Sequence, residues 1–178
     1  MQDLESLKYP IGEYNPPKAI TENTLKEWIE QLATLPEEIV EITADLSDAD
    51  LEIPYRRDGW TVRQVVHHLA DSHINAYSRV HLTLTEENPT VRPYHEERWA
   101  ELADGKTGDI QVSIDILKAI HKRLVALLKT LAFSDFDRTY FHPAAGKEFT
   151  LGYLVGNYAW HGKHHLAHIQ LTLNVNYS

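Results

Sequence analysis

The chain has 178 residues, of which 43% are hydrophobic and 24% charged, enough for a soluble single domain spanning residues 1–178 with its own core. It contains no cysteine, which excludes disulfides, thiolate metal sites and a cysteine nucleophile. Its net charge of -9 argues against nucleic acid and anionic membranes as partners. No basic region followed by an apolar run opens the sequence, so we expect a cytoplasmic protein without a signal peptide.

The N-terminal third of the chain predicts an arm followed by a helix. Residues 1–20 carry three prolines and a glycine, which disfavour helix, and their apolar side chains predict an ordered extended arm. Thr21 is the predicted N-cap of the first helix, in which apolar residues recur at threes and fours over residues 25–46. Pro36 lies inside this run and predicts a kink or a split into two helices. Residues 47–50 predict a loop.

The middle of the chain predicts a second helix and a long loop. Thr61 is the predicted N-cap, and the helix should end near Asn88. Residues 89–108 contain two prolines and two glycines and predict a long loop. Its acidic pair, Glu96 and Glu97, fits either a pocket rim or a subunit contact. Four histidines lie on the helix: His67, His68, His73 and His81.

The last third of the chain predicts two more helices. Asp109 should open the third, whose apolar residues have a period of 3.6. Residues 132–149 predict a small hairpin, and Thr150 should cap the fourth helix. From Asn174 the chain is a short polar tail. Four long amphipathic helices joined by substantial loops predict an all-α four-helix bundle with long connecting loops and an extended N-terminal arm.

The fourth helix contains a cluster of histidines. Four of the chain's 11 histidines fall within eight residues and form two pairs with i,i+4 spacing, His161 with His165 and His164 with His168. Two imidazoles at this spacing share a helix face and can bind one metal ion. The helical phase predicts that the 161/165 pair points into the bundle and that the other pair points toward its flank. No Glu lies between His161 and His165, which argues against a zincin-type protease.

A third ligand is expected from the second helix. His67 and His68 lie on opposite flanks of its apolar stripe, and periodicity does not choose between them. His73 lies nearer the centre of the stripe, as a core histidine bonded to a neighbour would. Asp71 could accept an imidazole N–H or could be an exposed helix carboxylate. The other histidines are expected to be structural, with His142 and Tyr140 as candidates for a pocket mouth: His81, His95, His121 and His142.

Two stretches resemble the helix signatures of the DinB/YfiT-like superfamily, namely GWTVRQVVHHLADS at residues 59–72 and WHGKHHLAHI at residues 160–169. YPIGEY at 9–14 and IPYR at 53–56 are similar to the YfiT-type metal-dependent hydrolases. The resemblance covers nearly the whole chain. It implies a four-helix bundle with a crossover, a homodimer, and one divalent metal ion per subunit, zinc ahead of nickel.

The resemblance also implies the ligands. The family's second-helix histidine directly precedes a Leu-Ala dipeptide, which matches His68, and its fourth-helix pair matches His161 and His165. Three ligands leave one position open, as in catalytic sites. Our first hypothesis is a hydrolase of a small molecule that uses metal-bound water as its own base. The alternatives are an S-transferase of a low-molecular-weight thiol such as bacillithiol and a non-catalytic metal-binding bundle.

Overall fold

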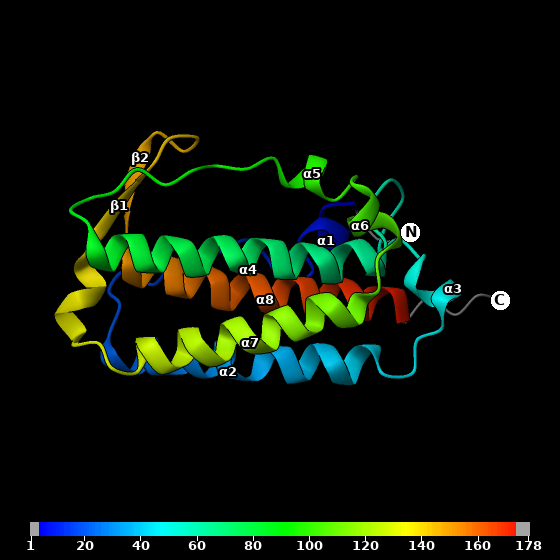
Figure 1. Cartoon of the computed structure of the whole chain (residues 1–178), viewed down its shortest axis with the longest axis horizontal. Helices are drawn as coiled ribbons and strands as arrows, with labels where there is room; N and C mark the ends of the chain where they lie inside the picture. The colour runs from blue at the N-terminus through cyan, green and yellow to red at the C-terminus, as the bar shows by residue number, and fades with distance from the viewer. Residues whose placement is uncertain (1–3, 174–178) are drawn as a thin grey trace.

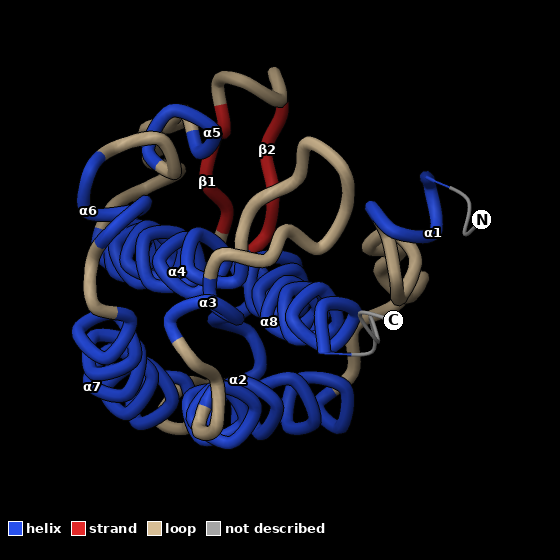
Figure 2. The backbone as a smooth tube through the Cα atoms, turned by 90° about the vertical axis from the view of Figure 1, so that its right-hand side faces the viewer, coloured by secondary structure: helices blue, strands red, loops and turns tan. Residues whose placement is uncertain are grey.

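Four long helices form the body of the molecule. The computed structural model describes residues 4–173. Viewed end on, α4 and α8 lie above α7 and α2, and each helix packs against two of the others (Figure 2). The predicted all-α four-helix bundle is therefore confirmed. The helices have these bounds: α2 Glu22–Thr43, α4 Val62–Thr85, α7 Ile110–Leu128 and α8 Leu151–Leu173.

The direction of the helices explains the long connection in the middle of the chain. Helices α2 and α8 run one way along the bundle, and α4 and α7 run the other way (Figure 1). Because α4 and α7 are parallel, residues 86–109 must return along the whole length of the bundle. They do so along the outer side of α4 and include α5 (Glu96–Trp99) and α6 (Ala103–Thr107). The predicted loop thus contains two short helices.

Two other short helices also differ from the predictions. Helix α1 (Leu4–Lys8) lies in the arm expected to be extended, in a stretch that precedes the first proline, Pro10. Helix α3 (Asp48–Leu51) lies in a predicted loop, where Ser47 and Asp50 form a capping box that satisfies backbone N–H groups at its start. The predicted N-caps of the long helices are confirmed: Thr21, Thr61, Asp109 and Thr150.

Pro36 does not split the first long helix, because α2 is continuous from Glu22 to Thr43. Proline has no backbone N–H, so the Leu32 carbonyl, four residues earlier, loses its partner within the helix. The Nδ1 atom of His121 lies 2.5 Å from this carbonyl oxygen. A side chain of α7 therefore replaces the missing helical hydrogen bond.

The hairpin is present as predicted. Strands β1 (Thr139–His142) and β2 (Lys147–Thr150) pair antiparallel, with Thr139 opposite Thr150. They follow a 3₁₀ turn, η1 (Phe133–Asp137), and stand at the opposite end of the bundle from α3 (Figure 1). No helix among the described residues is long and apolar enough to cross a membrane.

The core consists of two apolar clusters separated along the bundle. One lies toward the hairpin and includes Leu124 and Leu154, and the other lies toward α3 and includes Leu69 and Leu117. On α4 the boundary between the clusters falls at residues 71–75, and on α7 it falls at 118–123. Buried histidines occupy this boundary, so a polar layer crosses the bundle between its two apolar halves: His73, His121, His164, His165 and His168.

Candidate metal centre

Three histidines from two neighbouring helices converge beside this layer. His68 lies two turns into α4, and His161 and His165 lie one turn apart on α8, which packs antiparallel to α4. One ring nitrogen from each histidine lies within 4.8 Å of the other two, an arrangement that could hold a metal ion. The Nε2 atoms of His68 and His161 are 3.2 Å apart.

The spacing of these nitrogens fits a divalent ion. Two imidazole nitrogens about 2.0–2.1 Å from a tetrahedral zinc ion are about 3.3 Å from each other. The 3.2 Å between the two Nε2 atoms matches this separation. The donor set is entirely imidazole nitrogen, which suits zinc and other late first-row metals and does not suit calcium or magnesium.

The surroundings hold all three rings in the neutral form that binds metals. Burial, and then repulsion from His164 and His168, lowers the pKa of His68 to about 3. Burial lowers the pKa values of His161 and His165 well below the ordinary range, and repulsion between neighbouring imidazoles adds to the effect. The ring of Trp60 covers His68 at a centroid distance of 4.6 Å.

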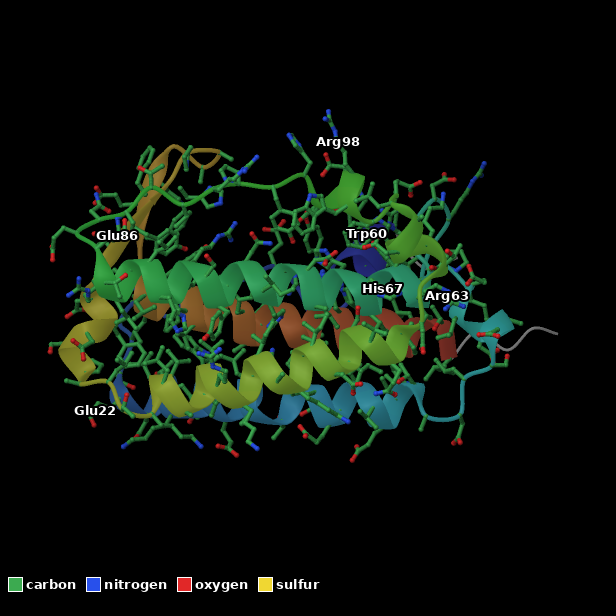
Figure 3. All side chains as sticks on the ribbon, in the orientation of Figure 1. Glu22, Trp60, Arg63, His67, Glu86 and Arg98 are labelled. Atoms are coloured by element: carbon green, nitrogen blue, oxygen red, sulfur yellow. The ribbon has the colours of Figure 1, made fainter. Side chains whose placement is uncertain are left out.

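The structure separates the two histidines that periodicity did not distinguish. The Nδ1 atom of His67 lies 2.7 Å from the Ser113 hydroxyl on α7, and its Nε2 lies 3.2 Å from the Gly108 carbonyl oxygen. Figure 3 shows His67 on the side of α4 that faces α7, with Trp60 on the opposite side. His67 is therefore turned away from the group that His68 joins.

His164 and His168, the pair predicted to point toward the flank of the bundle, are buried. The N-terminal segment covers this flank. The Tyr9 ring contacts His164, and the Lys8 carbonyl oxygen lies 3.1 Å from His168 Nε2. Tyr55 stacks on His168 at a centroid distance of 3.9 Å. Helical phase could not show this burial, because the covering residues lie more than 100 positions away in the sequence.

Asp71 makes no hydrogen bond to a histidine ring in the part of the chain that the structure describes. Burial and then repulsion from Asp104 raise the pKa of its carboxyl to about 6. His73 is fully buried, and its ring bonds a neighbouring side chain as predicted. That neighbour is His121 on α7. The Nε2 atom of His121 lies 2.9 Å from Nδ1 of His73.

Two cavities reach the histidine group. The larger, about 540 Å³, is lined by all three of these histidines together with Trp60 and Arg56. The smaller, about 340 Å³, is lined by His161, Arg79, Tyr158 and other residues. Both cavities also include Glu96 and Glu97 of α5, which places the acidic pair at pocket walls.

Residues that line the two cavities also carry buried polar atoms that have no hydrogen-bond partner among the residues the structure describes. Three such buried nitrogen atoms belong to residues of the two cavities: Arg56 Nε, Arg79 Nε and His164 Nδ1. Of the pair predicted at a pocket mouth, His142 lines the smaller cavity, whereas Tyr140 is buried in the apolar cluster near the hairpin. The charged residues of the walls, which include Arg56 and Arg79 as well as the acidic pair, can bind a polar molecule beside the three imidazoles.

Comparison with known proteins gives consistent matches over most of the chain. Residues 31–169 match the model of the DinB superfamily. A Bacillus cereus protein (strain ATCC 10987 / NRS 248) named "Putative metal-dependent hydrolase" is 48% identical over 166 residues, covering 93% of this chain and 95% of that protein. A Bacillus anthracis protein (strain A0248) of the same name matches with the same identity and coverage.

A solved structure has the same fold. It is YfiT from Bacillus subtilis, described as a probable metal-dependent hydrolase with an unusual four-helix bundle topology. It superposes with a TM-score of 0.93 and 45% identity, covering 97% of this chain and 99% of that one.

Proposed function

This chain belongs to the DinB superfamily, and we propose that it is a hydrolase that acts on a small molecule at a divalent metal ion held by His68, His161 and His165. The observation that carries the proposal is the convergence of three neutral imidazoles on the wall of a cavity. The names of its relatives, which describe metal-dependent hydrolases, support the same reading.

Three imidazole ligands would leave one coordination position for water or substrate, and a zinc ion so held lowers the pKa of bound water toward 7. The chain's own residues bind the ion, exclude bulk water and orient the substrate. The Trp60 ring covers one face of His68, and the Arg79 side chain on the wall of the smaller cavity can donate to a substrate oxygen. In hydrolysis a water oxygen bonds to the substrate, the leaving group departs, and the leaving group takes a proton.

A specific observation favours a second candidate, transfer of a low-molecular-weight thiol. The two cavities share His161, Glu96 and Glu97, so two reactants could approach one metal ion from separate spaces. The chain has no cysteine, so the sulfur would come from a cosubstrate. A carbon–sulfur bond would form, the bond to the leaving group would break, and the thiol proton would leave with that group.

The experiment that tests the proposal begins with metal content. We expect one zinc ion per chain by elemental analysis, with nickel as the next candidate, and a dimer by analytical ultracentrifugation. The zinc-loaded protein is then incubated with ester and amide panels, and separately with thiols plus electrophiles. Hydrolysis supports the first candidate. Thiol consumption without hydrolysis replaces it with the second. Stoichiometric zinc with no turnover in either panel identifies a non-catalytic metal-binding bundle.

A further inference from the structure

We propose that chains of buried imidazoles, each ending on a backbone carbonyl, hold the two α8 histidines in the one tautomer that leaves Nε2 free for the metal. The inference rests on the proposed metal site and concerns residues outside its ligand set. The two chains run as follows: His161 to His73 to His121 to the Leu32 carbonyl, and His165 to His168 to the Lys8 carbonyl.

In the longer imidazole chain, the carbonyl at its end determines which nitrogen of each ring carries the proton. A carbonyl only accepts hydrogen bonds, so Nδ1 of His121 must carry the proton that it donates to the Leu32 oxygen, 2.5 Å away. A neutral imidazole has one donor and one acceptor, so Nε2 of His121 accepts from Nδ1 of His73 at 2.9 Å. His73 Nε2 must then accept from Nδ1 of His161 at 3.4 Å. His161 is left with an unprotonated Nε2, the atom that faces His68.

Pro36 leaves the Leu32 carbonyl free to end this imidazole chain. In an uninterrupted helix, the N–H of residue 36 would donate to the Leu32 carbonyl, but proline has no N–H. The carbonyl is therefore available to His121 inside the core, where an unpaired acceptor would be costly. A proline that usually weakens a helix thus has a role in orienting a ring on α8, which packs against α2.

The shorter chain follows the same rule. The Lys8 carbonyl oxygen, 3.1 Å away, must accept from Nε2 of His168. The Nδ1 atom of His168 then accepts from Nδ1 of His165 at 3.2 Å. His165 is left, like His161, with Nε2 as its unprotonated nitrogen. The two chains use different helices and different carbonyls, yet both give the Nδ1-protonated tautomer.

This common result distinguishes a positioning role from ordinary burial of polar groups. A buried histidine elsewhere in the protein forms hydrogen bonds to groups that are not part of the metal site, as His67 does with Ser113 and Gly108. In contrast, each of the two imidazole chains begins at a proposed metal ligand and determines which ring nitrogen of that ligand is unprotonated. Outer partners of this kind typically change metal affinity by about 10–100-fold when they are removed. Neutral histidines achieve this without burying a charge in the core.

The first test uses the metal-free wild-type protein above neutral pH. Nitrogen–proton correlation NMR of the imidazoles reports which ring nitrogen carries the proton. We expect protonated Nδ1 in His73, His121, His161 and His165, and protonated Nε2 in His168. An Nε2-protonated His161 or His165 would overturn the proposal. No metal is added, so the tautomers can be determined whether or not the wild-type protein binds zinc. Zinc binding by the wild-type protein is the separate test of the proposed function.

The second test measures zinc affinity by chelator competition. His121→Leu removes both hydrogen bonds of the central imidazole, and we expect a loss of about tenfold or more. His121→Gln keeps one donor and one acceptor and should recover most of the affinity. His67→Leu is the matched control, since it removes a buried α4 histidine outside both chains. It should cost stability without changing zinc affinity.

A third comparison makes the test specific to each chain. His168→Leu should allow the other tautomer in His165 and leave the tautomer of His161 unchanged. His121→Leu should allow the other tautomer in His161 and leave the tautomer of His165 unchanged. The proposal fails if either substitution leaves both tautomers and the zinc affinity as in wild type. It also fails if His67→Leu lowers affinity as much as His121→Leu, because the loss would then follow packing.

Discussion

At the scale of single residues, the candidate metal centre depends on its three imidazole rings being uncharged. No carboxylate forms an ion pair with His68, His161 or His165 among residues 4–173, so nothing favours the charged imidazolium. Burial therefore lowers all three pKa values. A lone pair that is not competing with a proton is available to a metal ion at neutral pH, and binding should release few protons.

The adjacent histidines of α4 provide a matched pair of substitutions. We expect His68→Ala to abolish stoichiometric zinc, because two imidazoles alone bind the ion far more weakly than three. His67→Ala should retain one zinc ion per chain and should instead lower the free energy of unfolding by about 1–3 kcal/mol, since it leaves the buried Ser113 hydroxyl without its partner.

Elemental analysis after dialysis measures the first effect, and urea unfolding of the metal-free proteins measures the second. If both variants keep their zinc, or if both lose it, the assignment of His68 as the α4 ligand is wrong.

This pair also shows how far the sequence could resolve the site. The spacing of His161 and His165 and the resemblance of the chain to a known family predicted the group that converges in the structure. Helical phase alone could not choose between His67 and His68, because the choice depends on which neighbouring helix each one meets. His121 was missed for a similar reason, since its partners lie 48 and 89 positions away.

At the scale of elements, α8 must lie close to the arm and to α2 for the histidine layer to be covered. Gly156 permits this approach. A Cβ atom there would lie 2.7 Å from two carbons of the Trp28 ring and would also meet the Tyr14 hydroxyl. Gly152, on the same helix, has more room, because the nearest atom to its Cβ would be the flexible Ile20 Cδ1 at 3.2 Å.

Gly156→Ala should therefore destabilise the protein although alanine favours helix by about 1 kcal/mol. We expect a net loss of about 1–3 kcal/mol from overpacking against a rigid ring. Gly152→Ala is the control and should change the free energy of unfolding by less than about 1 kcal/mol in either direction. Urea unfolding of both variants measures the difference. A Gly156→Ala protein as stable as wild type would show that the arm can shift at little cost.

The long helices were predictable because each has an N-cap and an apolar stripe that repeats over many turns. The short ones were not. Helices of four or five residues, such as α3 and α5, have too few turns for periodicity to appear, and contacts with the bundle stabilise them. Gln64 on α4 illustrates this, since its side-chain amide donates to the Ala100 carbonyl just after α5. That α2 continues through Pro36 could not be predicted either, because the group that compensates for the missing hydrogen bond, His121, is on α7.

At the scale of the whole molecule, the polar layer between the two apolar clusters couples folding to pH. Burial, and then repulsion from neighbouring groups, lowers the pKa of His68 to about 3 and that of His164 to about 4. The ordinary value, which the unfolded chain should have, is about 6.5. The unfolded state therefore binds more protons at acid pH. The stability is fully present above about pH 6.5 and is lost as the pH falls from there toward the folded-state values.

We expect the free energy of unfolding of the metal-free protein to fall by roughly 1 kcal/mol per buried histidine for each pH unit below about 6.5. Urea titrations at several pH values measure the slope. His164→Gln removes one of these groups, which is not a proposed ligand, and should make the slope shallower by about one proton.

Zinc should oppose this acid loss, because an ion bound only by the folded state adds stability by mass action. Because the folded-state pKa values of the three ligands lie far below 6.5, protons compete with zinc for these nitrogens only at strongly acid pH, and the stability added by zinc should persist over the range in which the metal-free protein loses stability. Unfolding measured with and without zinc at each pH separates the two effects. If zinc adds no stability at neutral pH, the histidine layer is a structural feature of the core and does not bind a metal ion.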